Sequence, residues 1–470
     1  MRHTKLFHFT HILNRSFLCG EIMKKNPLII GTFILTITGF ISRILGFINR
    51  IFLSKIFGEE GMGIYQLVAP VMALVFALCA AGIQTSVSKH VAQETGTGNY
   101  KHSYHMVFAG LTVSCTLSLI CAYMVFTYSI PISTFFLGDI RTAPLLKMLA
   151  LSFPLSCIHS CINGYYYGIR KTALPALTQL AEQLSRILCI LFLYMYCEKK
   201  NIQLTLQGLV LGSITGEALA VLISLIAIYH RFHTIEKNFI KSWHPTLHTL
   251  PRHIGQILSL GAPLSANRIV INLLAGMETI MIPRSLVKYG LTYSSALSIY
   301  GVMTGMVIPL ILFPSAITNS VSVLLLPIVS EADVLNRQHT IAKAVRNSIF
   351  YCCLLGFTCT FFFFLFGIPI GNLLFSSTLA GKLLMIISFI CPFMYINTTL
   401  TSVINGLGRT FLTFSFSLTA LLIRLIFVIF VIPLFGINAY LMGLLVSQLI
   451  ITVLNVLALR KYILYNSVVS

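Results

Sequence analysis

Long apolar stretches recur along almost the whole chain, and they constrain its fold more than any other feature. A helix needs about 20 apolar residues to cross about 30 Å of hydrocarbon, at about 1.5 Å per residue. Connections between the stretches are mostly short, so the sequence predicts an all-α polytopic membrane protein. Twelve stretches qualify, with approximate limits 28–50, 62–87, 105–130, 145–167, 173–196, 205–229, 255–281, 298–328, 346–370, 382–404, 411–434 and 436–459.

The composition agrees with a membrane protein and gives its orientation. The chain is 57% hydrophobic and 9% charged, with mean hydropathy +0.89, outside the range of soluble domains. Its net charge of +20 raises the alternative of a nucleic-acid binder. With both termini cytoplasmic, however, 19 of the 32 Lys and Arg residues lie inside, 9 outside and 4 within spans. The positive-inside rule explains this bias. We therefore expect a multi-pass protein of the cytoplasmic membrane, monomeric and without a nucleic-acid partner.

The spans divide six and six about the longest polar connection. Residues 1–22 lack the apolar core of a signal peptide and are expected to be a disordered extension or a misassigned start. The central connection holds five histidines and Trp243, but the spacing fits no compact metal site. The expected units are an N-terminal lobe at 23–229, a basic cytoplasmic linker at 230–254, a C-terminal lobe at 255–460 and a cytoplasmic tail at 461–470.

The two halves carry an internal repeat. Ile162-Asn163-Gly164 ends the fourth span, Lys171-Thr172 opens the fifth, and Arg186 follows 14 residues after Thr172. Ile404-Asn405-Gly406, Arg409-Thr410 and Arg424 repeat this order in the second half, although the first gap differs by four residues. Because each half has an even number of spans, the repeats share one orientation and are related by a pseudo-two-fold axis along the membrane normal. In such transporters the substrate site lies between the halves.

Several charged residues interrupt the apolar runs. A charge at bilayer depth costs roughly 2.5 to 3.5 kcal/mol on insertion scales, so it usually faces a bundle interior or a wet cavity. Four arginines suggest a cavity for an anion. The residues concerned are Arg43, Arg186, Arg268 and Arg424, joined by Glu182, Glu217 and Glu278.

The first span carries a single polar or small stripe at helical spacing. The alternative to a binding face is a packing seam, with Arg50 reaching the outer interface. Arg43 is too far from either end to reach an interface easily, which favours a functional role. The stripe consists of Thr32, Thr36, Gly39, Arg43, Gly46 and Arg50.

Spans five and seven carry the other polar faces. Glu182 and Arg186 are four residues apart and can form a neutral structural pair, the alternative to substrate binding. Arg424 has no carboxylate within one turn, which makes it the freer cation of the two repeat mates. Span five carries Gln179, Glu182, Gln183 and Arg186, and span seven carries Asn267, Arg268, Asn272 and Glu278, so Glu278, Glu182, Asn267 and Asn272 are candidates for ion coupling or charge pairing.

Span eight is expected to be bent, and the chain is not expected to be an enzyme. Span eight contains Pro309, Pro314 and Pro327. The sequence has no GxxxxGK[ST] motif and no catalytic or metal-ligand constellation on a common face, so neither a cofactor nor a metal is expected. The twelve cysteines include no CxxC pair and lie mostly in apolar runs, where cysteine usually acts as a small hydrophobe.

Three segments resemble the stage V sporulation protein B family of the multidrug/oligosaccharidyl-lipid/polysaccharide exporter superfamily. They are SRILGFINRIFLSKIFGEEGMGIYQLVAP (42–70), QLAEQLSRI (179–187) and YGVMTGMVIPLILFPSAITNSVSVLLLPIVSEA (300–332). The resemblance implies two six-helix lobes in a V around a central cavity. It also implies export of undecaprenyl-pyrophosphate-linked sugars, with the peptidoglycan precursor lipid II expected, including for the spore cortex.

The resemblance carries over to named residues with one departure. The related lipid II flippases share an S-R-x-L-G-F core, matched here from Ser42 to Phe47. A further essential arginine of those relatives aligns with Asn49, and Arg50 is the candidate substitute. Many relatives have 14 spans, whereas this chain supports 12. Arginine suits a pyrophosphate because its five donors match phosphate oxygens.

Two other functions remain open. A multidrug/cation antiporter of the same superfamily would favour carboxylates in the first lobe, but span one offers arginine instead. A flippase for another envelope polysaccharide cannot be separated from a lipid II flippase by sequence. Without a nucleotide site, transport would be driven by an ion gradient, by consumption of the substrate outside, or by the membrane potential, at about 2.3 kcal/mol per charge per 100 mV.

Overall fold

The structure is a computed structural model that describes residues 27–98, 100–235 and 243–469. Over these residues the protein is built from helices, without strands. Eleven of the described helices are long and apolar enough to cross a membrane, or twelve when the bent pair Ile140–Ala150 and Ser152–Gly168 forms one span. The predicted all-α polytopic fold is therefore confirmed. The expected extension at 1–22 lies outside the described residues.

The chain order of the helices follows the two halves of the sequence, with η1, η2, η4 and η6 being π-helical and η3 and η5 being 3-10 helices. The first half contains α2 (Pro27–Leu67), α3 (Ala69–Phe76), η1 (Ala77–Ala81), α4 (Gly82–Gly96), α5 (Tyr100–Thr127), α6 (Ser129–Pro131), η2 (Ile132–Leu137), η3 (Ile140–Thr142), α7 (Ala143–Ala150), α8 (Ser152–Gly168), α9 (Ala173–Lys199) and α10 (Leu206–Ile235). The second half contains α11 (Trp243–Lys288), α12 (Tyr293–Gly301), η4 (Val302–Val307), α13 (Ile308–Leu312), α14 (Ser315–Val334), α15 (Gln338–Phe375), α16 (Thr378–Ile387), η5 (Ser388–Ile390), α17 (Cys391–Gly406), α18 (Thr410–Ile426), η6 (Phe427–Val431), α19 (Ile432–Phe435) and α20 (Ile437–Val469).

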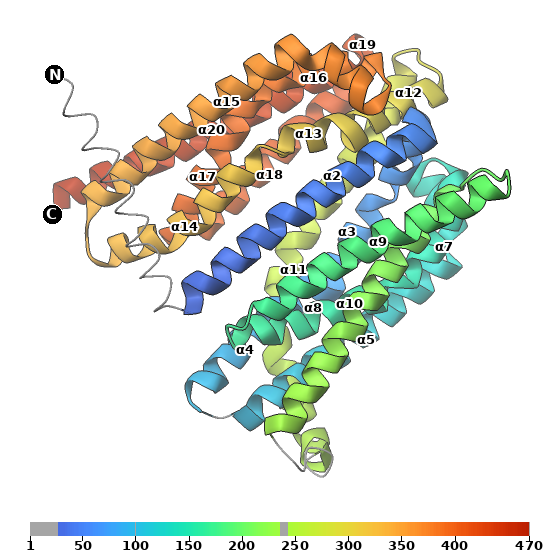
Figure 1. Cartoon of the computed structure of the whole chain (residues 1–470). Helices are drawn as coiled ribbons and strands as arrows, with labels where there is room; N and C mark the ends of the chain where they lie inside the picture. The colour runs from blue at the N-terminus through green and yellow to red at the C-terminus, as the bar shows by residue number, and fades with distance from the viewer. Residues whose placement is uncertain (1–26, 99, 236–242, 470) are drawn as a thin grey trace, which may run out of the picture.

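A glycine separates the first two spans. α2 crosses the whole molecule, and Gly58 inside it has φ 64° and ψ −169°. Residues with a Cβ avoid this conformation, so glycine is needed at the break. Glu59 and Glu60 follow at the start of the next helical segment, where the helix dipole favours negative charge. The chain therefore turns at this point, and α3 returns across the molecule (Figure 1).

The first helix of each half packs against both halves. α2 contacts α9 and also α12 and η4, while α11 contacts α4 and α5 and also α18. In Figure 1 these two helices lie between α4–α10 on one side and α14–α20 on the other. A Cβ on Gly82 of α4 would lie 2.3 Å from Gly261 O of α11, so glycine permits this close crossing. Small residues of this kind let helices pack closely in lipid.

The helix boundaries explain the unequal spacing in the internal repeat. α8 ends at Gly168, four residues after Gly164, whereas α17 ends at Gly406 itself. The expectation that Gly164 ends its span is therefore wrong, because α8 continues for one more turn. That turn accounts for the four extra residues before Lys171-Thr172. Thr172 then donates a hydrogen bond to Gly31 O of α2, at 3.1 Å.

The polar ends of the halves are more helical than expected. α10 extends to Ile235 and α11 begins at Trp243, so helix occupies most of the expected linker at 230–254, and residues 236–242 lie outside the description. His253 is buried rather than solvated, and its ring stacks on that of His105 with 5.6 Å between centroids. The expected tail at 461–470 continues α20 as far as Val469. Regular helix satisfies its own backbone polar groups, which a loop cannot do beside apolar neighbours.

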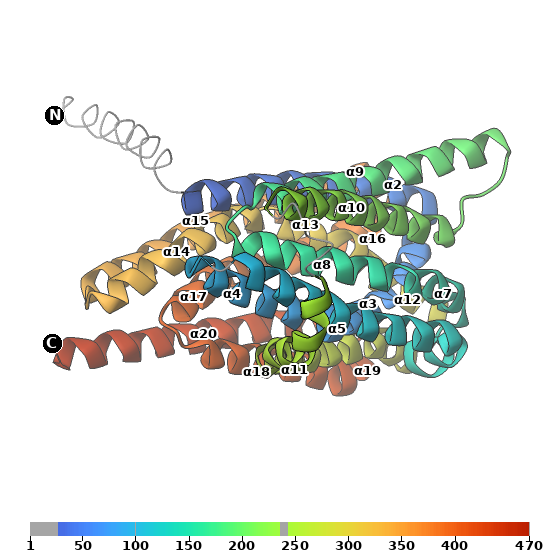
Figure 2. The ribbon, with the colours of Figure 1, turned by 90° about the horizontal axis from the view of Figure 1, so that it is seen from below.

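Both chain ends lie at one end of the molecule, here called the terminal end. Figures 1 and 2 show the start of α2, the α14–α15 connection and the last turns of α20 there. The Tyr462 hydroxyl of α20 donates a hydrogen bond to Asp333 of α14. Arg409, between α17 and α18, stacks over the Tyr462 ring at 4.6 Å. The opposite end, which contains Gly58, Glu59 and Glu60, is called the distal end.

Candidate functional site

A polar groove runs between α2 of the first half and η4, α13 and α14 of the second half. It consists of two adjoining cavities of about 500 Å³ and 300 Å³, which share Arg43 and Asn319 in their walls. The predicted stripe forms the α2 wall. The smaller cavity is lined by Thr36, Gly39 and Arg43, and the larger one by Arg43, Gly46 and Arg50. The predicted cavity between the halves is present in this form.

The opposite wall comes from span eight, which is broken as its prolines predicted. η4 is π-helical, and Pro309 begins the regular turn of α13 that follows it. Sequence reasoning missed the polar groups of this wall, although they lie in the third family-like segment. They are Thr304, Ser315, Asn319 and Ser320, with Gln66 of α2 nearby.

An aromatic group stands beside the arginines. The Phe313 ring lies 6.1 Å from that of Phe40 and 5.8 Å from that of Phe47, between centroids. Residues 40 and 47 are two turns apart on α2, with Arg43 between them. Phe313 therefore packs across α2 close to the point where the two cavities meet.

The groove is positively charged. Arg43 and Arg50 are the charged residues in its described lining, and no carboxylate lies among the lining residues. Arg43 is exposed to the groove, whereas Arg50 is half-buried. Asn49 is only 8% exposed and does not line the groove, so Arg50 provides the second cation of this helix. Two guanidinium groups without a counter-ion suit an anionic ligand.

Arg424 is paired with a carboxylate, contrary to expectation. Its Nη2 lies 3.3 Å from Oε2 of Glu278, and the Tyr440 hydroxyl donates to Glu278 Oε1 at 2.8 Å. Glu278 is 5% exposed. The expectation that Arg424 is the freer cation is wrong because its partner belongs to α11 and is 146 positions earlier, beyond any one-turn search. Charge pairing describes the contacts of Glu278.

Arg186 is also paired, here within its own helix. Its Nη2 donates to Oε1 of Glu182, as the four-residue spacing allows. Neither Arg186 nor Arg424 is among the lining residues of the groove. The polar face of α9 nevertheless adjoins α2, since a Cβ on Gly46 would lie 3.5 Å from Gln183 Nε2.

The remaining candidates on α11 separate into two groups. Asn267 and Arg268 are exposed and are not in the described groove lining. Asn272 donates to Ala73 O of α3 at 3.0 Å, which ties the second half to the first. The arginines are thus distributed over separate environments, with Arg43 and Arg50 together in the groove.

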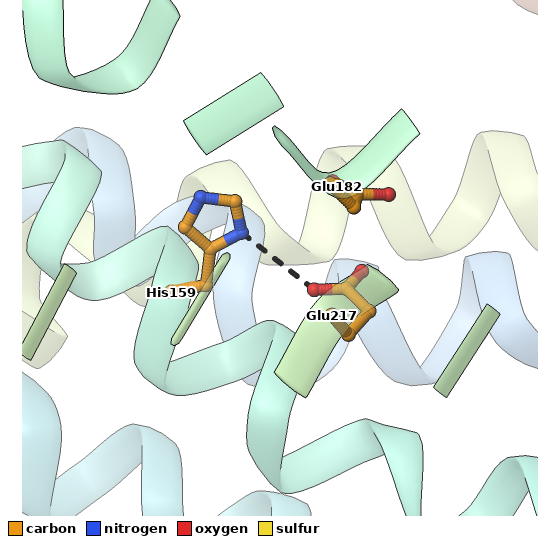
Figure 3. A group of neighbouring side chains, drawn as sticks. All are labelled: His159, Glu182 and Glu217. Carbon is orange, nitrogen blue, oxygen red and sulfur yellow. Dashed lines mark ion pairs between the residues drawn. The ribbon is translucent and has the colours of Figure 1, made fainter. Parts of the chain in front are cut away.

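A second polar cluster lies inside the first half, and only part of it was expected. His159 of α8, Glu182 of α9 and Glu217 of α10 bring one ligand atom each within 4.8 Å of the others (Figure 3). Sequence reasoning missed His159 because a lone histidine in an apolar run gives no spacing signal. These residue types can bind metals, but Arg186 already occupies Glu182, which disfavours a divalent ion.

A helical membrane protein with an ion-lined groove between two halves is a transporter. Solved structures share its fold. An inward-facing MATE family transporter of the MOP superfamily has a TM-score of 0.70 at 14% identity, covering 91% of this chain and 96% of that one. The lipid II flippase MurJ in an inward closed conformation has a TM-score of 0.67 at 16% identity, covering 92% and 90%.

The sequence comparisons give the family. Stage V sporulation protein B of Bacillus subtilis (strain 168) is 26% identical over 442 residues, 93% of this chain and 85% of the relative. Lipid II flippase MurJ of the same organism is 24% identical over 174 residues, 35% of this chain and 32% of MurJ. Residues 28–332 match the family described as polysaccharide biosynthesis protein, and the chain belongs to that family. It is a transporter rather than an enzyme.

Proposed function

We propose that this protein carries an undecaprenyl-pyrophosphate-linked saccharide across the cytoplasmic membrane by alternating access, and that this substrate is lipid II. The observation that carries the proposal is the groove in which Arg43 and Arg50 lie seven residues apart on α2 without a carboxylate in the lining. The relatedness to MurJ, whose name specifies lipid II, supports this choice of substrate. Sporulation in the name of the other relative makes the spore cortex a destination to test.

The physical reason is the cost of dehydrating a pyrophosphate. Guanidinium groups replace water on phosphate oxygens with charge-assisted hydrogen bonds, each worth about 1.5–3 kcal/mol. Gln66, Thr304 and Asn319 add neutral polar groups for the sugar. The polyprenyl tail can remain in lipid while the headgroup occupies the groove. A cationic drug would meet two arginines instead, which argues against the multidrug antiporter alternative.

The proposal includes an orientation. The terminal end faces the cytoplasm, so that both chain termini and the α10–α11 connection are inside. The Lys and Arg bias of the sequence and the meeting of the α14, α17 and α20 ends at the terminal end support this orientation. The distal end then faces outward.

The test is translocation of labelled lipid II by purified protein in proteoliposomes. Arg43→Ala should lower the initial rate roughly ten- to hundredfold, as expected for one lost charged hydrogen bond. Arg43→Lys should recover only part, because an ammonium lacks the planar fork. Arg460→Ala, an exposed cation of α20, is the matched control and should behave as wild type.

Two results would contradict the proposal. Full activity of Arg43→Ala would remove the role of the groove. Mass-spectrometric identification of a different lipid-linked saccharide, bound to wild type and lost in Arg43→Ala, would show that the groove serves another envelope polysaccharide.

A further inference from the structure

The polar cluster of the first half has a function that the groove does not explain. His159, Glu182 and Glu217 come from three consecutive helices, and none is in the described lining of the groove. Figure 3 shows the His159 ring directed toward Glu217, with Glu182 on the adjacent helix. Three ionisable groups at this depth are costly unless they are compensated or used.

The contacts of His159 leave acceptors without donors. Nδ1 lies 3.6 Å from Glu217 Oε2, and Nε2 accepts from Asn163 Nδ2 at 2.9 Å. Thr178 Oγ1 is 3.1 Å from the same Nε2 and donates to backbone carbonyls of its own helix. Two buried acceptors of the cluster, Glu217 Oε2 and Asn163 Oδ1, have no hydrogen-bond partner, and Asn163 is only 9% exposed.

A protonated imidazole supplies these missing donors. The Nδ1–H of an imidazolium can donate to Glu217 Oε2 after a small approach from 3.6 Å. Its Nε2–H can donate to Thr178 Oγ1, or to Asn163 Oδ1 once that amide rotates. Histidine is also the side chain that ordinarily changes charge between about pH 5 and 8.

The charges of the cluster require one more positive charge. Arg186 neutralises Glu182, which leaves Glu217 beside a neutral histidine with a net charge of −1. A single proton makes the cluster neutral, whereas a divalent metal would make it positive. The charged groups near Glu182 are Glu217, Arg186 and His159. From the other neighbouring elements, η1 and α5 bring the thiols of Cys79 and Cys115 close to Cys157 of α8, and α4 directs His90 toward Gln256 O of α11.

A cavity provides access and a mechanical connection. Glu217 lines a space of about 350 Å³ whose other walls include Met72, Ala73 and Phe76 of α3. The same α3 accepts a hydrogen bond at Ala73 O from Asn272 of α11, across the two halves. A change in the cluster can thus reach the interface between the halves through α3.

We propose that His159 and Glu217 form a proton-binding site, with Glu182 and Arg186 as a fixed neutral pair beside it, and that proton binding there drives transport. The coupling to transport rests on the proposed function; the proton site itself does not. The proton resides on His159 and is stabilised by Glu217, and its exchange through the cavity changes the charge of the first half by one.

The first experiment measures protons directly and needs no substrate. Potentiometric titration of purified protein between pH 5 and 8 should show that wild type binds about one proton more than His159→Gln. Glu217→Gln, which is nearly isosteric, should shift that uptake to lower pH and serves where His159→Gln folds poorly. Equal titration of wild type and His159→Gln would overturn the site, because His159 would then be a neutral structural residue.

The second experiment tests the coupling. With the membrane potential clamped at zero, an imposed pH gradient should change the initial rate of lipid II export at least fivefold in wild type and not in His159→Gln. His90→Gln, a histidine of α4, is the control and should retain the response. A response to a sodium gradient at constant pH, lost in His159→Gln, would overturn the proton as the ligand. If wild type exports no lipid II while the titration still shows the proton, the proposed function fails and the proton site stands.

Discussion

Gly63 of α2 and Gly301 at the end of α12 pack backbone against backbone. A Cβ on Gly301 would lie 2.4 Å from Gly63 N, closer than real Cβ contacts. This crossing joins the two halves near the distal end, because Glu59 O is also 2.2 Å from the same hypothetical Cβ. It can persist only in a conformation in which the distal ends of α2 and α12 are together.

Gly301→Val should therefore open the distal end. Overpacking of this kind costs about 1–3 kcal/mol in the conformation described, which shifts the balance toward separated halves by roughly 5- to 150-fold. In a cysteine-free background, Thr304→Cys in the groove should react faster with an impermeant maleimide added outside. Gly39→Ala is the control, since a Cβ there meets nothing within 4 Å. Unchanged labelling in Gly301→Val would show that the crossing does not close the groove.

Glu60 links three segments at the distal end. Its Oε1 lies 2.7 Å from Arg141 Nη1, and its Oε2 accepts from the Ser294 hydroxyl at 2.6 Å. Exposed pairs contribute only about 0.2–1 kcal/mol. Glu60→Ala should leave the melting temperature within about 2 °C and alter the transport rate by up to about fivefold. A large loss of stability would instead make Glu60 a folding residue.

The pair Arg424–Glu278 should be structural. Arg424→Ala leaves a buried carboxylate without its partner, which typically costs about 3–5 kcal/mol. Thermal melting in detergent should show a clear loss, and adding Glu278→Gln should restore most of it, because the amide needs no counter-ion. If Arg424→Ala melts normally but no longer binds lipid II, then Arg424 acts on the substrate.

Arg50 should carry the role that relatives assign to the neighbouring position. Arg50→Gln should reduce lipid II transport at least tenfold, because it removes one of two groove cations. Asn49→Ala should change substrate affinity less than twofold, since Asn49 is buried away from the groove. Binding by native mass spectrometry separates the two, and the reverse ranking would contradict this assignment.

Topology is tested by labelling from each side. Cysteines placed at Arg337 and Arg460 should react only from the cytoplasmic side, and one placed at Lys199 only from outside. Exposure of Arg337→Cys or Arg460→Cys to an external reagent would invert the orientation and with it the direction of transport.

Local pattern was enough to predict the elements of the molecule. Twelve apolar runs predicted the spans because a bilayer requires long apolar helices, and proline placement predicted the break in span eight. The stripe from Thr36 to Arg50 could be recognised because all its members lie on one helix, whose geometry is regular. The same reasoning correctly allowed the Glu182–Arg186 pair.

Partners from distant helices could not be predicted. The sequence by itself determined an all-α membrane protein, its repeat and the arginine face of α2, since each depends on neighbouring residues along the chain. Only the tertiary structure decided that Arg424 meets Glu278, that Asn319 faces Arg43 and that His159 meets Glu217. The reason is physical: apolar helices can pack in many ways in lipid, and the packing of small residues such as Gly63 and Gly301 selects which polar faces meet.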